Sequence, residues 1–124
     1  MREVVLSFTT LQFYDNYVVS IVNSGVDLGS DRITELGEVI KKEFGDKPFG
    51  YISCRTNDYS LDPIKFMSVI RESNVRAAAF VLTRKISYDS FESEKYFYQL
   101  PLATFSDIES AKKWMVEYME SNYD

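Results

Sequence analysis

The chain has 124 residues, of which 45% are hydrophobic and 27% are charged, and its formal net charge is −5. This length fits one domain with one core, and the apolar fraction is too high for a disordered chain. Because there is no histidine and only one cysteine, the composition excludes histidine-based catalysis, an intrachain disulfide and cysteine-rich metal sites. The acidic balance argues against a nucleic-acid partner, since binding phosphates requires clustered Lys and Arg.

The sequence contains no segment that resembles a membrane span or a secretion signal. Its apolar runs, such as Ala77–Leu82, are far shorter than the roughly 20 residues that cross a bilayer. Its first residues enter a strand pattern without an apolar leader. We therefore expect one cytoplasmic domain over residues 1–124, with no transmembrane segment, no metal and no cofactor.

The first predicted elements are two strands. β-Branched and aromatic residues are frequent in Glu3–Phe13 and again in Tyr17–Val22. Asp15 and Asn16 between them are typical turn residues. This pattern predicts an antiparallel hairpin.

A helix and a buried strand are predicted next. Ser30 or Asp31 can cap the helix, and Gly45 is a suitable stop. Phe49–Cys54 has the apolar character of a central strand. The apolar positions of the helix recur at helical spacing: Ile33, Leu36, Ile40 and Phe44.

A second helix is predicted to begin at Asp62 and Pro63, as an N-cap followed by proline in the first turn. Asn74 is a candidate for a left-handed residue at the end of this helix. Ala77–Thr83 is compatible with helix or strand, and its Phe-Val-Leu-Thr ending favours a strand. The apolar face of the helix is expected to carry Ile64, Met67 and Ile70.

The last third is predicted to contain a helix over Ser90–Tyr98, capped by Asp89, and a strand over Leu100–Phe105. A capping box that starts at Ser106 opens the final helix. The resulting order is β-β-α-β-α-β-α-β-α. It predicts a single-domain α/β fold with a mixed, mainly parallel sheet and an N-terminal antiparallel hairpin. One face of the final helix is expected to carry Ile108, Ala111, Met115 and Tyr118, beside Trp114.

This order and the C-terminal segment resemble SpoIIAA-like domains, relatives of the STAS domains of anti-sigma-factor antagonists. The resemblance implies a small mixed-sheet domain, 1–124, that binds a protein partner or an apolar ligand and does no chemistry. Aromatic residues at this spacing also fill ordinary cores. The resemblance is based on Glu94, Phe97, Pro101, Phe105, Glu109, Ala111 and Trp114.

In that family, a serine in the loop before the second helix is phosphorylated by a partner kinase. The matching loop here lacks the family's Asp-Ser-Ser/Thr-Gly run, and Ser60 is the candidate phosphoacceptor. A phosphate would be favoured near a helix N-terminus, but these residue types are also ordinary in turns and caps. Loops after parallel strands are common binding sites, so we expect a ligand or partner loop at Arg55, Thr56, Asn57, Asp58, Tyr59 and Ser60.

Two further groups of residues are candidates for binding. Arg84 and Lys85 follow the predicted fourth strand, where they form either a cationic rim with the loop or a solvated strand end. Five aromatic residues in one short segment suggest an apolar pocket near Met67, a dimer interface or simple core filling. These aromatic residues are Tyr88, Phe91, Tyr96, Phe97 and Tyr98.

Cys54 ends the predicted central strand, where a free cysteine is usually an inert apolar residue. An enzyme would need an Asp, Tyr or Lys with a shifted pKa. The leading hypothesis is therefore a non-enzymatic regulatory or protein-interaction module of the STAS/SpoIIAA-like type, with a protein partner and a homodimer. The alternative is a domain that binds a small apolar ligand or lipid in an aromatic-lined pocket.

Overall fold

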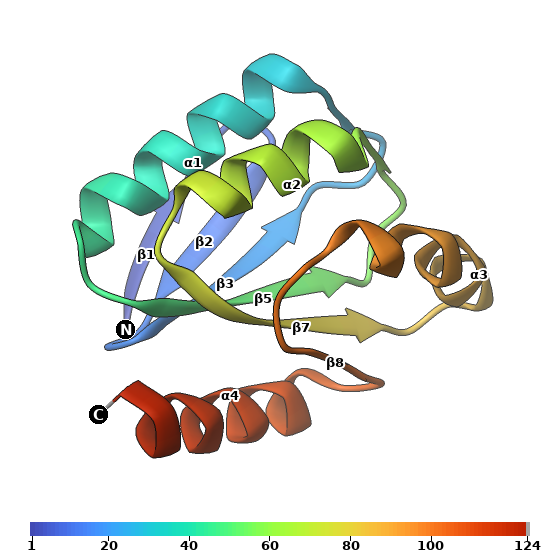
Figure 1. The fold of residues 1–124 in the computed structure, drawn as a ribbon. Helices are drawn as coiled ribbons and strands as arrows, with labels where there is room; N and C mark the ends of the chain where they lie inside the picture. The colour runs from blue at the N-terminus through green and yellow to red at the C-terminus, as the bar shows by residue number, and fades with distance from the viewer. Residues whose placement is uncertain (124) are drawn as a thin grey trace.

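A computed structural model describes residues 1–123, with the backbone alone at positions 86 and 87. A six-stranded sheet of order β1-β2-β3-β5-β7-β8 forms the middle layer. Helices α1, α2 and α3 lie on one side of it and α4 on the other (Figure 1). The strands are β1 (Arg2–Val5), β2 (Thr9–Phe13), β3 (Tyr17–Val22), β5 (Phe49–Arg55), β7 (Val75–Leu82) and β8 (Leu102–Phe105).

The helices complete the layers, together with a small second sheet. They are α1 (Ser30–Phe44), α2 (Pro63–Glu72), α3 (Lys85–Glu94) and α4 (Ile108–Tyr123), with a 3-10 turn η1 (Lys95–Phe97) after α3. The small sheet pairs β4 (Asp27–Leu28) with β6 (Ser60–Leu61) in parallel. In the part of the chain that the structure describes, no helix combines the length and the apolar character required to cross a membrane.

The pairing of the strands confirms the predicted α/β class with a mixed, mainly parallel sheet. The pairs β1–β2 and β2–β3 are antiparallel, whereas β3–β5, β5–β7 and β7–β8 are parallel. One row of the register places Ser20 opposite Ser53, Ser53 opposite Phe80, and Phe80 opposite Thr104. The carboxyl ends of β3, β5 and β7 therefore meet at one edge of the sheet.

The prediction of one strand over Glu3–Phe13 is wrong. The chain turns after β1, where the amide of Leu6 donates to the carbonyl of Thr9 at 2.8 Å, and β2 returns antiparallel to β1. The predicted hairpin is present between β2 and β3, with the Tyr14 amide 2.9 Å from the Tyr17 carbonyl. β-Propensity was high on both sides of the turn and did not show where the chain reverses.

The predicted end of α1 at Gly45 is confirmed, but its predicted N-cap is wrong. Gly29 is the N-cap, and no side chain accepts a hydrogen bond there, so neither Ser30 nor Asp31 caps the helix. Gly45 ends α1 with a φ of 60°, a conformation that glycine adopts without strain. All four apolar positions predicted for this helix are buried.

The N-terminus of α2 is confirmed, but its predicted apolar face is shifted. Asp62 accepts hydrogen bonds from the amides of Ile64 and Lys65, both at 3.2 Å. Ile64 itself is 64% exposed, and Phe66 is the buried residue of this helix. Asn74 does not adopt a left-handed conformation.

The ambiguous segment after α2 forms a strand, β7, as predicted. The following helix, α3, begins at Lys85 rather than Ser90, so Asp89 lies within it and does not cap it. The capping box predicted at Ser106 is also wrong. Asp107 caps α4 instead, and its Oδ1 accepts from the Ser110 amide at 2.8 Å.

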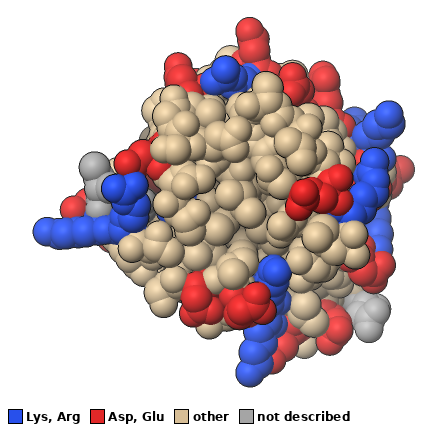
Figure 2. Space-filling model, turned by 180° about the vertical axis from the view of Figure 1, so that it is seen from behind, with Lys and Arg blue, Asp and Glu red and all other residues tan. Residues whose placement is uncertain are grey.

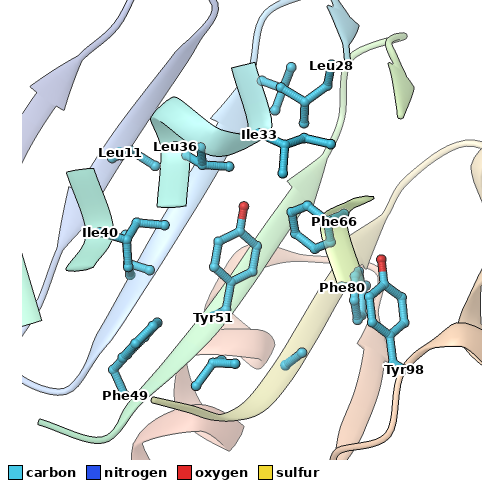
Figure 3. Close-up of a cluster of buried hydrophobic side chains, with 14 of the residues drawn as sticks. Leu11, Leu28, Ile33, Leu36, Ile40, Phe49, Tyr51, Phe66, Phe80 and Tyr98 are labelled. Atoms are coloured by element: carbon cyan, nitrogen blue, oxygen red, sulfur yellow. The ribbon is translucent and has the colours of Figure 1, made fainter. Parts of the chain in front are cut away.

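Two clusters of buried side chains flank the sheet. Between the sheet and α1 and α2, Tyr51 and Phe66 pack edge to face with ring centroids 5.6 Å apart (Figure 3). Phe80 and Tyr98 continue this cluster toward α3 (Figure 3). On the opposite side, α4 buries Ala111, Met115 and Met119 against β3, β5 and β7.

Uncharged side chains occupy the centre of the face seen from behind, and Lys, Arg, Asp and Glu lie around its edge (Figure 2). The register places Val5, Thr10 and Ile21 in one row across β1, β2 and β3. Ile21 packs with the α4 cluster, so this row lies on the α4 side of the sheet.

Candidate functional site

An open pocket of about 590 Å³ lies at the edge of the sheet where the parallel strands end. Its walls come from the turn before β4 (residues 25–26), from Arg55 and residues 57–61, and from Ser90 and Glu94 of α3. Most of the loop predicted from the sequence therefore lines one cavity. This position agrees with the general rule that α/β sheets bind ligands beyond the carboxyl ends of their strands.

Arg55 is the central charged group of the pocket. It is the last residue of β5 and not a loop residue as predicted, and it is 8% exposed. Its Nη1 and Nη2 donate to Oε1 and Oε2 of Glu94 at 2.5 and 2.6 Å, and its Nε donates to Ser53 Oγ at 3.1 Å. This is a two-pronged ion pair, the strongest geometry between arginine and a carboxylate.

Two aromatic rings pack against the guanidinium of Arg55. Its carbon lies 5.0 Å from the Phe80 ring centroid and 5.8 Å from that of Phe91. Burial by itself lowers the pKa of Arg55, but the neighbouring Tyr59 and Glu94 outweigh it and raise the pKa, so the group stays charged. The buried cation is thus neutralised by Glu94 and packs against two neighbouring aromatic rings.

Tyr98 completes this network. Its hydroxyl donates to the Glu94 carboxylate, and its ring packs 5.3 Å from Phe80 and 6.1 Å from Phe66, centroid to centroid (Figure 3). Burial, followed by the charge of Glu94, raises the pKa of Tyr98, so the hydroxyl keeps its proton and remains a donor. Three donors therefore converge on one carboxylate.

A second ion pair crosses the outside of the pocket. Arg84 Nη1 lies 2.7 Å from Asp58 Oδ2, and both side chains are about half exposed. The structure therefore brings Arg84 to the loop, as in the rim alternative, but its charge is paired with Asp58. Thr56 and Lys85 are exposed and do not line the pocket.

The remaining loop residues hold the local backbone. Asn57 Nδ2 donates to the Val22 carbonyl at 3.0 Å, the Gly25 amide donates to the Asp58 carbonyl at 2.6 Å, and Tyr59 is half-buried against the core. These contacts tie the segment after β5 to the segment after β3.

Ser60, the candidate phosphoacceptor, is exposed in β6. Its hydroxyl donates to Asp27 Oδ1 at 2.9 Å, so a phosphate there would face a carboxylate at close range. Asp62 already accepts from the first amides of α2. The electrostatic advantage that the sequence suggested for a phosphate at this helix start is therefore small.

The aromatic segment divides into buried and exposed residues. Phe91 and Tyr98 are buried next to Phe80, whereas Tyr96 is 80% exposed and Tyr88 and Phe97 are partly exposed. Core filling, one of the three alternatives for this segment, therefore applies to Phe91 and Tyr98 but not to Phe97, which is 36% exposed.

No large apolar cavity accompanies these aromatics among the described pockets. The apolar cavity between α1 and α2 has a volume of about 30 Å³, which is room for about one water molecule. A lipid chain does not fit there without rearrangement of the core.

The chemical groups near the pocket are poor nucleophiles. Burial raises the pKa of the Cys54 thiol, which keeps it protonated and unreactive. Burial also raises the pKa of Tyr51. Within the described residues, no group of three or more Cys, Asp and Glu side chains is arranged to hold a metal ion.

Sequence reasoning missed Glu94 as a partner of Arg55 and missed the contributions of Gly25, Val26 and Ser90. One signal was available: an arginine at the end of a buried strand requires a counterion. The carboxylate that supplies it lies 39 residues away, and no short motif connects the two.

Comparisons with protein-family models, with curated proteins and with solved structures found no match for this chain.

Proposed function

We propose that the chain is a non-enzymatic regulatory or protein-interaction module of the STAS/SpoIIAA-like type, which binds a partner at the pocket beyond β5. The observation that carries the proposal is the pocket itself. It combines an exposed rim, with Asp58 and Arg84, and a buried Arg55–Glu94 ion pair whose arginine is fixed on the central strand β5. Binding sites commonly combine adaptable loops with a rigid scaffold.

The chemistry of the site also favours recognition over catalysis. Its carboxylate Glu94 accepts hydrogen bonds from Arg55 and Tyr98, and the nearest thiol, Cys54, is buried with a raised pKa. General acid–base catalysis requires a group whose pKa lies near the working pH and which reaches the substrate. The pKa values of Cys54 and Tyr98 are raised, which moves both groups further from neutral pH.

Site-specific photo-crosslinking in cells of the source organism tests this function. A photoreactive phenylalanine derivative replaces Tyr59, which lines the pocket, and in a control it replaces Glu38, which is exposed on α1. We expect an adduct of defined mass at position 59 and none at position 38. The charge reversal Asp58→Lys should remove that adduct, and equal adducts at both positions would overturn the proposal.

We also propose that the module forms a homodimer through the α4 side of β1, β2 and β3, where Val5, Thr10 and Ile21 form an uncharged row. Two chains of net charge −5 repel each other least where the facing surfaces are neutral. Light scattering after size exclusion should give twice 14.4 kDa at micromolar concentrations. Val5→Glu, at a side chain that is 69% exposed in the row shared with Thr10 and Ile21, should return the monomer, and a monomeric wild-type chain would disprove the dimer.

A further inference from the structure

The side chains that donate hydrogen bonds to the Glu94 carboxylate and Glu94 itself are held by different parts of the fold. Arg55 and Ser53 belong to the central strand β5, and Tyr98 packs on Phe80 and Phe66 in the core. Glu94, in contrast, is the last residue of α3. The donor groups of the contact therefore belong to the sheet and core, and the carboxylate belongs to a peripheral helix (Figure 1).

The attachment of α3 is slight. Among its described side chains Phe91 is buried and Glu94 is partly buried, and the others are exposed. At its start no side chain caps the helix, and the Arg84–Asp58 pair that holds this end is about half exposed to solvent. Elements with few buried apolar contacts open more easily than the rest of a fold.

The pocket gives a second molecule access to the same donors. Arg55 and Glu94 both line it, and their side chains are 10% and 11% exposed. A carboxylate that enters from the pocket can therefore meet the guanidinium without passing through the core. Because the guanidinium is buried and stays charged, it requires an anion whether or not Glu94 is in place.

We propose that Arg55, with Tyr98, is a receptor for a carboxylate of the binding partner, and that Glu94 is its intramolecular occupant. The incoming carboxylate takes the place of the Glu94 carboxylate and releases the C-terminal end of α3. The proposal rests on the binding role of the pocket and names the chemical group that the pocket recognises. On this proposal α3 changes when the partner binds, because the C-terminal end of α3 is released when the incoming carboxylate occupies Arg55.

Removal of the Glu94 carboxylate tests whether Arg55 binds a carboxylate from solution. In Glu94→Ala, sodium acetate should raise the melting temperature and shift the NMR signal of the Arg55 Nε–Hε group, whereas sodium chloride at the same ionic strength should not. The double variant Glu94→Ala/Arg55→Lys should lose both effects, because lysine does not present the two-pronged donor geometry. Glu94→Gln, which keeps the side-chain volume, provides the same comparison if the alanine variant does not fold.

The wild-type chain tests displacement. Acetate should accelerate amide hydrogen exchange over residues 90–94 at least twofold relative to chloride, with α4 unchanged. If acetate binds Glu94→Ala but leaves exchange in the wild type unaltered, the ion pair is a permanent structural contact and displacement is wrong. A larger response to inorganic phosphate than to acetate would overturn the assignment to carboxylates.

The crosslinking experiment separates this inference from the proposed function. A partner adduct at position 59 that persists in 200 mM acetate supports binding at the pocket but contradicts the carboxylate receptor. Loss of the adduct in acetate, and not in chloride, supports both. No adduct at all removes the binding function, whatever the acetate titrations show.

Discussion

Helices α3 and α4 both follow a parallel strand, yet the sheet holds them by different means. α4 buries Ala111, Met115 and Met119 in a continuous apolar cluster. α3 buries Phe91 among its described side chains and relies on two ion pairs, at Arg84 and at Glu94. Apolar packing contains no charged partner that a dissolved ion can replace, whereas one member of an ion pair can be exchanged for another ion. The difference indicates which helix is built to stay in place and which to respond.

The largest effect is expected at the α4 interface. Met115→Ala removes a side chain that is 0% exposed and should lower the free energy of unfolding by about 2–5 kcal/mol, as buried truncations do. Urea denaturation measures this loss. Lys113→Ala, on the exposed side of α4, is the matched control and should change little. A loss below about 1 kcal/mol in Met115→Ala would mean that α4 is not anchored by packing.

The next effect should be local. Phe91→Ala removes the buried anchor of α3, so amides of α3 should exchange at least about tenfold faster while α4 retains most of its protection. Hydrogen exchange followed by NMR resolves the two helices. Equal loss of protection in both would show that α3 opens only when the whole domain unfolds, and the contrast between the helices would then fail.

Alkaline pH should act through a buried tyrosine on the α4 side. Burial, with the nearby Tyr14 and Glu109, raises the pKa of Tyr17 from 10.0 to about 12. The folded state therefore favours the protonated phenol, so stability is complete below pH 10 and falls between pH 10 and 12. The slope is at most about 1.4 kcal/mol per pH unit for one tyrosine. The free energy of unfolding of Tyr17→Phe, from denaturation curves at each pH, should fall less between pH 10 and 12 than that of the wild type. Tyr96→Phe, at an exposed ring, should show the same pH dependence as the wild type.

The smallest effect is expected at the rim of the pocket. Arg84→Ala breaks an ion pair whose two side chains are 48% and 60% exposed, and such pairs contribute about 0–1 kcal/mol. The melting temperature should therefore change little from that of the wild type, and the difference should be smaller still at high salt. A loss above about 2 kcal/mol would mean that α3 is fixed by this contact and cannot act as a releasable element.

The sequence predicted most of the framework because its signals were local. Apolar spacing located α1, the Asp62–Pro63 pair located the start of α2, and the alternation of strands and helices indicated the α/β class. Errors arose where several residues satisfied the same local rule, as with Ser106 and Asp107 at the start of α4. Tertiary packing decides which of such neighbouring residues forms the cap, and short sequence patterns carry no information about that packing.

The candidate site was only partly predictable. Parallel strands must end at a common edge, so the meeting of Asp58 with Arg84 could be anticipated from topology. The contact between Arg55 and Glu94 could not, because it depends on the path of α3 after β7. Glu94 entered the sequence argument only through the C-terminal resemblance, and its location shows that it neutralises the arginine.

The short strand β1 also has a consequence for the behaviour of the chain in concentrated solution. It forms one edge of the sheet, and its exposed residues Arg2 and Glu3 are charged, with Arg2 bound to Glu43 of α1. Unpaired edges invite pairing with other chains, and short, charged strands discourage it. Without β1, the edge would be β2, with its buried Leu11 and Phe13. β1 thus acts as a guard against aggregation through the sheet.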